Sequence, residues 1–519
     1  MKTIATVWLA VCATLPMLSS CGSNGGNNPG SRLVVTDPAT ACQGISTTFK
    51  MSGTTVDAAT YVASGFVPPG STGAINQPFC RLEVTSRPSA DSDIKSEVWM
   101  PAVTAWNGRF LAVGGSGNSG SIQYAAMGDG LAAGYAVLST DNGHKGNEQT
   151  FAIGHPEKVI DFGHRAQAVT AVSGKALTKA FYEESAKKSY WLGCSQGGGK
   201  GMMQSQRYPD NFDGIVAGSP VFDWVGSQFA ASWVAVKGMR DPAAFVPKAK
   251  LPVVRKAAMA ACDGKDGLAD GVIQRPERCE FNPAVLACAP GTDSNACLTP
   301  GQVASMQRYY SPVTRPDGRQ IYAAYPPGSE GGSAWLGSTS PLGNWAGFWP
   351  HVVYENPAYS IVASLNVDSD VDYNFAKAKL AAHYDAVNTD LTAFNARQGK
   401  LMIWHGYDDF AVSAYHTRDY VDQVTSRHGT GTNNFMRAFF APNVGHCGGS
   451  DGPQLDQMAL LASMVEWVEK GVAPASVTAT RRVGNVVERT MPVCAYPLVA
   501  KYRGTGDSKD AASFTCSAP

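Results

Sequence analysis

The chain has 519 residues, and 42 lysines and arginines balance 42 aspartates and glutamates, which excludes a global field that attracts nucleic acid. Hydrophobic residues make up 44% of the chain and charged residues 16%, which excludes wholesale disorder and permits a large core. The length suits two or three average domains, or one large enzyme fold that carries an insertion.

The N-terminal segment 1–21 has the features of a bacterial lipoprotein signal. A positive Lys2 precedes a mostly apolar stretch at 3–18, and Leu18-Ser19-Ser20-Cys21 resembles a lipobox, in which Cys21 is lipidated after cleavage. The polar, glycine-rich segment 22–40 is typical of a flexible tether. An ordinary secretory signal cleaved nearby is the alternative. Both interpretations predict export, as a periplasmic or outer-membrane lipoprotein or as a secreted protein.

Export makes the twelve cysteines informative. Without Cys12 in the signal and Cys21 in the lipobox, an even number remains, and in an oxidising compartment this predicts five disulfides. Natural local pairs are Cys262 with Cys279, Cys288 with Cys297, and Cys494 with Cys516. Among the cysteines that remain, Cys194 and Cys447 are a candidate long-range pair, although spacing alone does not fix the connectivity.

A glycine-rich loop follows the first strand that we expect in a hydrolase core. The strand is RFLAV at 109–113, and the loop is GGSGNSGS at 114–121. A backbone without side chains can approach a substrate closely and offer its N–H groups to a developing oxyanion. The alternative is a plain turn.

The stretch GCSQG at 193–197 matches the G-x-S-x-G pattern of an esterase nucleophile turn. A buried strand is expected before it at 188–192, and a helical run that ends at Pro209 follows it. This context exposes a serine hydroxyl, so Ser195 is the candidate nucleophile and the N–H of Gln196 is a candidate oxyanion donor. A structural glycine turn is the alternative.

The segment 221–394 is predicted to be a lid domain, inserted between two parts of a hydrolase core at 41–220 and 395–519. Within it, CDGKDGLADGVI at 262–273 places three carboxylates in eight residues among glycines, a composition that suits a hard cation. The loop is not an EF-hand, because Gln274 stands where the closing glutamate would be. An Asp/Gly surface turn is the alternative.

A serine nucleophile needs a histidine base and an orienting carboxylate, which in α/β-hydrolases follow in the order Ser, Asp or Glu, His. The strand expected at 400–404 leads into His405-Gly406-Tyr407-Asp408-Asp409. An acid just beyond a strand end is suitably placed, and spacing leaves both Asp408 and Asp409 open. His405 precedes the acid and is expected to brace the turn.

The candidate base is His446, which follows a second expected strand at 437–440. The other histidines after the acid are His416, on a helical stretch, and His428, in a polar loop, and both are expected to face solvent. Cys194 precedes the serine and Cys447 follows the histidine. A disulfide between them would hold the nucleophile and base loops together.

The motifs G-C-S-x-G-G-G, H-G-x-x-D and G-H-C-x-G together resemble the tannase/feruloyl esterase family. The likeness extends over WNGRF at 106–110, DGIVAGSP at 213–220 and YPLVAKYRGTGD at 496–507, and is greatest toward bacterial members that hydrolyse terephthalate monoesters. It implies an α/β-hydrolase fold with a large lid. It also implies a triad of Ser195, His446 and Asp409, rather than Asp408, with Gly117 and Gln196 as oxyanion donors.

The resemblance further implies five disulfides and one structural calcium ion, with no organic cofactor. The implied pairs are Cys42–Cys80, Cys194–Cys447, Cys262–Cys279, Cys288–Cys297 and Cys494–Cys516. The implied calcium ligands are the side chains of Asp263, Asp266 and Asp270 and the carbonyls of Leu268 and Val272.

The implied substrate is an ester of a small aromatic acid, of feruloyl, galloyl or terephthalate type. Trp335, Trp345 and Phe348 are candidate walls of its pocket, and ordinary lid core is the alternative. The terephthalate-type members hold the free carboxylate with a lid arginine, whereas 338–362 contains neither Arg nor Lys here, and an unpaired carboxylate is costly in an apolar pocket.

Two other functions compete with an esterase, namely a peptidase and a catalytically silent binding protein on the same fold. Partners other than a small ester are limited to a membrane, through lipidated Cys21. The sequence leaves the oligomeric state and the identity of the ester open.

Overall fold

The computed structural model describes residues 37–332, 336, 343–449 and 452–519, and a nine-stranded mixed sheet is the central element of this part of the chain. The strand order is β1-β2-β3-β5-β4-β6-β7-β10-β11. The first strands pair antiparallel: β1 (Thr54–Val62), β2 (Phe79–Ser86), β3 (Ile94–Pro101) and β5 (Ala136–Thr140). The remaining strands run parallel to β5: β4 (Arg109–Val113), β6 (Lys188–Cys194), β7 (Gly214–Gly218), β10 (Lys400–Gly406) and β11 (Met436–Ala441).

Helices cover both faces of the parallel half, which explains why its strands are continuous hydrophobic runs. One face packs against α2 (Tyr124–Ala132) and α13 (Gln457–Lys470), and the other against α4 (Ala166–Tyr182), α5 (Gln196–Arg207) and α12 (Ala414–His428). Successive strand residues alternate between the two layers, so that Tyr190 joins the first cluster and Trp191 the second. The strands predicted at 109–113, 188–192, 400–404 and 437–440 are confirmed, with β6, β10 and β11 extending one or two residues further.

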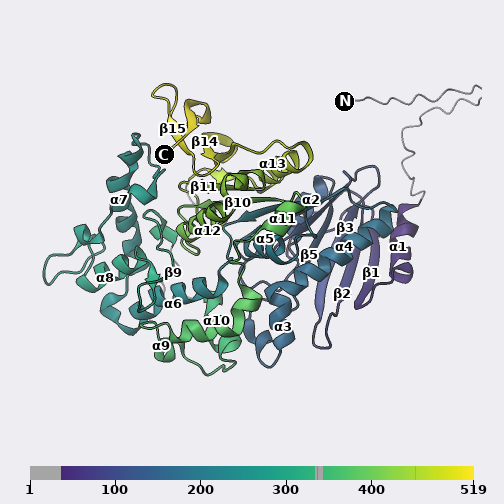
Figure 1. Cartoon of the computed structure of the whole chain (residues 1–519), viewed down its shortest axis with the longest axis horizontal. Helices are drawn as coiled ribbons and strands as arrows, with labels where there is room; N and C mark the ends of the chain where they lie inside the picture. Colours follow the sequence, from purple (N-terminus) through teal and green to yellow (C-terminus); the bar gives the residue numbers. More distant parts are fainter. Residues whose placement is uncertain (1–36, 333–335, 337–342, 450–451) are drawn as a thin grey trace, which may run out of the picture. The chain divides into compact units, whose positions relative to one another are not determined.

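The chain between β7 and β10 adds no strand to the nine-stranded sheet in its described residues. It contains the helices α6 (Trp224–Arg240), α7 (Leu251–Cys262), α8 (Pro300–Tyr309), α9 (Ile361–Ser364), α10 (Val371–Tyr384) and α11 (Thr392–Ala396), and a short ribbon of β8 (Val313–Thr314) and β9 (Gln320–Tyr322). Most of these elements share a separate hydrophobic core that includes Phe229, Met306 and Trp349. In Figure 1 the helices α6 to α10 lie together at the left and lower left, in teal and green, whereas α11 lies beside α5.

A β-hairpin follows α13 and consists of β13 (Ser476–Val483) and β14 (Val486–Cys494). The short strand β12 (Gln454–Leu455) pairs with β13, and β15 (Val499–Tyr502) pairs with β16 (Phe514–Ser517). Remaining helices of the core are α1 (Pro38–Thr48) and α3 (Pro156–Ile160).

The five disulfides that the family resemblance implied are all present, including the long-range pair Cys194–Cys447. The signal and lipobox at 1–21 and most of the predicted tether lie outside the described residues. Among the helices of the described ranges, none combines the length and apolar character that a bilayer crossing requires.

Candidate active site

The nucleophile turn lies between β6 and α5, where Ser195 has the dihedral angles φ 60° and ψ −121°. A non-glycine residue rarely adopts positive φ, and a strained turn of this kind projects a serine side chain beyond the sheet edge. The neighbouring glycines are required sterically, because a Cβ atom on Gly197 would stand 2.8 Å from the carbonyl oxygen of Gly115. The turn therefore packs directly against the predicted oxyanion loop.

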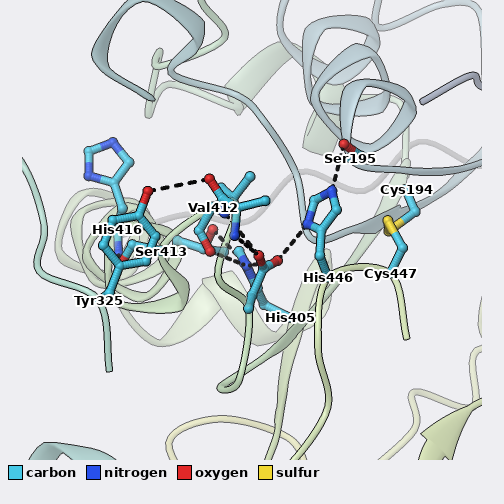
Figure 2. Close-up of polar contacts among 12 residues, drawn as sticks. Cys194, Ser195, Tyr325, His405, Val412, Ser413, His416, His446 and Cys447 are labelled. Atoms are coloured by element: carbon cyan, nitrogen blue, oxygen red, sulfur yellow. Dashed lines mark hydrogen bonds and ion pairs between the residues drawn. A yellow bond between two sulfur atoms is a disulfide. The ribbon is translucent and has the colours of Figure 1, made fainter. Parts of the chain in front are cut away.

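Ser195, His446 and Asp409 form a continuous hydrogen-bonded chain (Figure 2). The Nε2 atom of His446 lies 2.8 Å from Ser195 Oγ, and its Nδ1 atom lies 2.7 Å from Asp409 Oδ2. The second oxygen of Asp409, Oδ1, accepts the backbone N–H groups of Ala411 and Val412 at 2.8 and 2.9 Å. The three predicted residues thus meet in the geometry that general-base activation of a serine requires.

The pKa shifts of Asp409 and His446 suit the transfer of a proton from Ser195 to His446. Burial alone would raise the pKa of Asp409, but the charge and hydrogen bonds of His446 and His405 reverse this and hold that pKa well below its usual value. Burial alone would lower the pKa of His446, but the Asp409 carboxylate outweighs burial and raises it. Asp409 is therefore ionised, and His446 is a stronger base than a free imidazole.

Asp408 has a different partner and takes no part in the hydrogen bonds that connect Ser195, His446 and Asp409. Its side chain is buried and pairs with Arg255 of α7, with Asp408 Oδ2 and Arg255 Nη2 2.6 Å apart. Burial raises the pKa of Asp408 to about 6. The ambiguity that spacing left between the two aspartates is thus resolved by contact, because only Asp409 touches His446.

His416 and His428, the other histidines that follow the acid in the sequence, do not face solvent as predicted. His416 stacks on Tyr322 at 4.0 Å and contacts Asp223 through Nε2 at 3.1 Å, because α12 turns this side toward the lid rather than outward. His428 is half-buried, and its Nε2 atom lies 3.2 Å from the N atom of Leu391. Polarity of the surrounding sequence gave no indication of either contact.

The loop that carries Asp409 is held by the lid. Ser413 donates from Oγ to the carbonyl of Ala324 at 2.5 Å, and Tyr325 donates from its hydroxyl to the carbonyl of Ala411 at 3.3 Å. Figure 2 shows Tyr325 and Ser413 beside this loop, on the side away from His446. The lid therefore supports the candidate acid as well as adding its own core.

The disulfide Cys194–Cys447 joins the residue before Ser195 to the residue after His446, with a Cα–Cα distance of 5.9 Å. Cys447 also has a positive φ of 56°, so the backbone bends sharply where the base loop meets the bridge. A covalent link at this point limits how far the serine and the imidazole can separate.

The two predicted oxyanion residues are close in sequence to the Gly115–Gly197 contact, since Gln196 directly precedes Gly197 and Gly117 follows shortly after Gly115. Gln196 is the first residue of α5, so its N–H has no acceptor within the helix. Gly117 has φ 57°, and no atom stands within 4 Å of the place where its Cβ would be. The loop therefore contacts the nucleophile turn at Gly115 and has free space beside Gly117.

Sequence reasoning missed the support of this loop, which comes from the segment 141–146. The Nε2 atom of His144 lies 2.8 Å from the carbonyl oxygen of Asn118, and Gly120 and Gly146 exchange backbone hydrogen bonds of 2.6 and 3.1 Å. Burial lowers the pKa of His144 to about 4, so the ring is neutral. The available signal was the polar run DNGH at 141–144, directly after the strand β5.

The acidic loop of the lid folds around one of its own carboxylates. Asp263 accepts the backbone N–H groups of Asp270, Gly271 and Val272 at 3.0–3.1 Å, and Asp266 Oδ1 accepts from the N–H of Leu268 at 2.9 Å. Across the described ranges, no three acidic, histidine or cysteine side chains are already arranged as a metal cluster.

The third carboxylate of this loop is poorly compensated. Asp270 Oδ2 meets Arg489 at 3.2 Å, whereas its Oδ1 is buried and has no hydrogen-bond partner among the described residues. Burial first, and then the charges of Asp263 and Asp266, raise the pKa of Asp270 to about 6 despite Arg489. Crowded carboxylates and an unpaired oxygen fit a hard divalent cation.

The predicted aromatic wall is only partly supported as such. Phe348 has no exposed surface and packs in the lid core, so it offers nothing to a substrate in this conformation, and the core interpretation holds for it. Trp345 is half-buried and lies parallel to Trp224 with ring centres 6.2 Å apart. Trp335 lies outside the described residues.

Comparisons with known proteins cover the core and the insertion together. A family model described as tannase and feruloyl esterase matches residues 80–517. An uncharacterized esterase of Xanthomonas campestris is 34% identical over 94% of this chain and 93% of its own length, and a probable feruloyl esterase B-1 of Aspergillus flavus is 32% identical over 85% and 87%. The crystal structure of feruloyl esterase B from Aspergillus oryzae matches with a TM-score of 0.86 at 30% identity, covering 93% of this chain and 100% of that chain.

Proposed function

Because this chain belongs to the tannase and feruloyl esterase family and is a carboxylic ester hydrolase, we propose that it cleaves esters of small aromatic acids through an acyl-enzyme on Ser195. The observation that carries the proposal is the hydrogen-bonded chain from Ser195 Oγ through His446 to Asp409. The names of the similar feruloyl esterases support an aromatic acid as the acyl part of the substrate.

In the first half of the reaction, Ser195 Oγ bonds to the ester carbonyl carbon and its proton passes to His446 Nε2. The carbonyl oxygen becomes an oxyanion, which the N–H groups of Gly117 and Gln196 stabilise by ~3 kcal/mol each. Cleavage of the ester C–O bond follows, and His446 returns the proton to the departing alcohol.

In the second half, a water molecule gives its proton to His446 and its oxygen bonds to the acyl carbon. The Ser195 ester then breaks, Oγ recovers the proton, and the aromatic acid leaves. Throughout both halves, Asp409 remains ionised and holds His446 by Nδ1, because its own pKa lies far below that of the imidazolium.

Turnover of p-nitrophenyl esters by the purified protein tests the enzyme against a silent binding protein. We expect release of p-nitrophenol that Ser195→Ala abolishes without changing the melting temperature, since Ser195 supports the reaction and not the core. An aryl amide of the same acid should remain intact, and its hydrolysis would favour the peptidase. Turnover that survives Ser195→Ala would contradict the mechanism.

A competition assay narrows the choice of aromatic acid in the substrate. Methyl ferulate, methyl gallate and a terephthalate monoester are offered together, and products are separated by chromatography. We expect the two uncharged esters to react faster, because 338–362 supplies no Arg or Lys to pair with the free carboxylate of the terephthalate monoester.

For the acidic loop, we propose a structural calcium ion held by Asp263, Asp266 and Asp270 and the carbonyls of Leu268 and Val272. The unpaired Oδ1 of Asp270 and the repulsion that Asp270 experiences from the charges of Asp263 and Asp266 support this. The ion would neutralise their repulsion and fix the loop that continues α7.

We also propose export, with attachment to a membrane through lipidated Cys21. The five disulfides support an oxidising compartment. Metabolic labelling with a palmitate analogue tests the anchor, and loss of label in Cys21→Ser distinguishes it from an ordinary secretory signal.

A further inference from the structure

Asp409 Oδ2 serves two histidines, not one. It lies 2.7 Å from His446 Nδ1 and 3.0 Å from the Nε2 atom of His405, which comes from the strand β10. Both histidines are drawn in Figure 2, where dashed lines mark their contacts. We propose that His405 is a positioning residue of the reaction, which fixes the carboxylate so that Oδ2 faces His446. This inference rests on the proposed function.

The contacts of His405 determine which ring nitrogen carries a hydrogen. Its Nε2 atom faces Asp409 Oδ2 and, at 3.1 Å, the carbonyl oxygen of Val412, and both groups only accept. Nε2 therefore carries a hydrogen whether the ring is neutral or charged. The opposite nitrogen, Nδ1, lies 2.9 Å from the hydroxyl of Thr417, which can donate or accept.

The ring is held rigidly enough to orient another side chain. His405 has no exposed surface, and its strand neighbour Gly406 lies so close to Val444 that a Cβ there would stand 2.0 Å from the carbonyl oxygen. Hydrogen bonds from both sides, to Thr417 and Asp409, prevent the ring from turning. The position of Nε2 is thus set largely by β10, which carries His405, and by Thr417 of α12, both outside the loop that carries the acid.

The carboxylate of Asp409 then has four donors, two on each oxygen. The N–H groups of Ala411 and Val412 satisfy Oδ1, and the two histidines satisfy Oδ2. Without His405, His446 would be the single remaining donor to Oδ2, and the orientation of the carboxylate would be less firmly fixed. A small misplacement of catalytic groups costs on the order of 10²-fold in rate.

Four variants test the role, with kcat, KM and melting temperature measured on a p-nitrophenyl ester. In His405→Leu, which removes the donor, we expect kcat to fall on the order of 10²-fold with KM unchanged, because Asp409 contacts no substrate. In His405→Gln, the amide can reach the place of Nε2, and most of the loss should be recovered. The matched pair His428→Leu and His428→Gln alters a histidine that contacts the backbone of Leu391 and Thr389 instead of Asp409, and should leave kcat unchanged.

A His405→Leu variant that melts like the parent and keeps the parental kcat would overturn the proposal. If that variant does not fold, His405→Asn replaces it, since its amide reaches only the place of Nδ1. We then expect His405→Gln to be active and His405→Asn to be impaired, and equal kcat values in the two folded variants would overturn the proposal.

A fluorophosphonate that reacts with Ser195 separates this inference from the proposed function. Its rate of attachment depends on the activated serine but not on the identity of the ester. An inactive parent on all esters would refute the proposed function, whereas the rate of attachment in the His405 variants would still test the positioning role. Slower attachment in His405→Leu supports the role, and an unchanged rate overturns it.

Discussion

Two loops of this molecule bury aspartates and treat their charge in opposite ways. At the end of β10, Asp409 has four donors, and its pKa is held well below the usual value. In the acidic loop of the lid, Asp270 has an oxygen without a partner, and burial beside two other carboxylates raises its pKa to about 6. The surroundings therefore favour the ionised form of Asp409 and disfavour the ionised form of Asp270.

The difference indicates which site the protein completes by itself. Every polar atom of the Asp409 carboxylate is matched by groups of the core, so the candidate triad is preorganised before a substrate binds. The lid loop concentrates negative charge and leaves it partly unmatched, which a bound cation would correct. Breaking either loop should consequently affect different properties, namely rate in the first and stability in the second.

The largest expected effect is that of Asp409→Asn. Loss of the carboxylate permits the wrong tautomer of His446, and kcat should fall by about 10⁴-fold. The pKa of His446 should fall as well, because burial persists and the raising charge is gone. Since the base must be neutral, activity disappears as pH drops through this pKa, and the acidic limb of the kcat/KM profile should move to lower pH in the variant.

Asp408→Asn is the matched control for that change. It removes the neighbouring carboxylate, which pairs with Arg255 and not with His446. We expect a lower melting temperature, since Arg255 loses its ion pair with Asp408, and an acidic limb at the parental pH. Equal losses of kcat in the two variants would mean that contact with His446 does not distinguish the roles of the two aspartates.

The next effect is that of removing the bridge between the catalytic loops. In a Cys194→Ser, Cys447→Ser double variant, kcat should fall on the order of 10²-fold, because the serine and the imidazole are no longer held together. Closure of so long a loop also stabilises the protein by roughly 5 kcal/mol in the chain-entropy model. Rate and melting temperature are measured together.

The double variant Cys288→Ser, Cys297→Ser supplies the comparison. That bridge spans 9 residues of the lid, and its removal costs roughly 2.5 kcal/mol in the same model. Its kcat below the melting transition should stay at the parental value. A comparable loss of rate in both double variants would show that the bridge beside Ser195 stabilises without positioning.

A smaller effect is expected from His144→Phe, which keeps the ring beside Phe151 but removes the donor to the carbonyl of Asn118. The oxyanion loop would lose one of its supports while the backbone pair of Gly120 and Gly146 persists. We expect about a tenfold loss of kcat with little change in KM, since an oxyanion donor that moves weakens only the transition state. His144→Gln should be milder, and a kcat equal to that of the parent in His144→Phe would exclude this support.

The contrast between the two loops also explains what the sequence could predict. Ser195, Asp409 and His446 follow strands whose hydrophobic runs are unambiguous, and parallel strand ends converge on one edge of a sheet. Asp408 and Asp409 could not be separated, because a difference of one residue in a turn is decided by the path of the loop and by Arg255, which lies far away in the sequence. Spacing carries no information on such a contact.

Residues that act through tertiary contacts were the least predictable. His416 appeared to be on a polar helix face, yet the lid residue Tyr322 covers it, and Phe348 appeared to be a pocket wall, yet it fills the lid core. His144 was not predicted as a functional residue, because its partner is the backbone carbonyl of Asn118. The sequence does not indicate which backbone groups a side chain contacts. Predicting these positions requires knowing how the lid packs on the core.

The smallest effect on rate, and the sharpest test of the comparison, is removal of the proposed cation. Chelation with EGTA should lower the melting temperature, and added calcium should restore it, because an ion bound at a hundredfold excess over its Kd stabilises a fold by about 2.7 kcal/mol. Asp270→Asn should abolish this response, whereas Asp317→Asn, at an exposed lid aspartate paired with Arg319, should retain it. The kcat of folded protein should be the same with and without chelator, because Asp409 and His446 are satisfied by the core alone. A parental melting temperature that ignores both chelator and calcium would remove the ion from the lid, and a kcat that falls with chelation while the fold persists would show that the two loops are not separate.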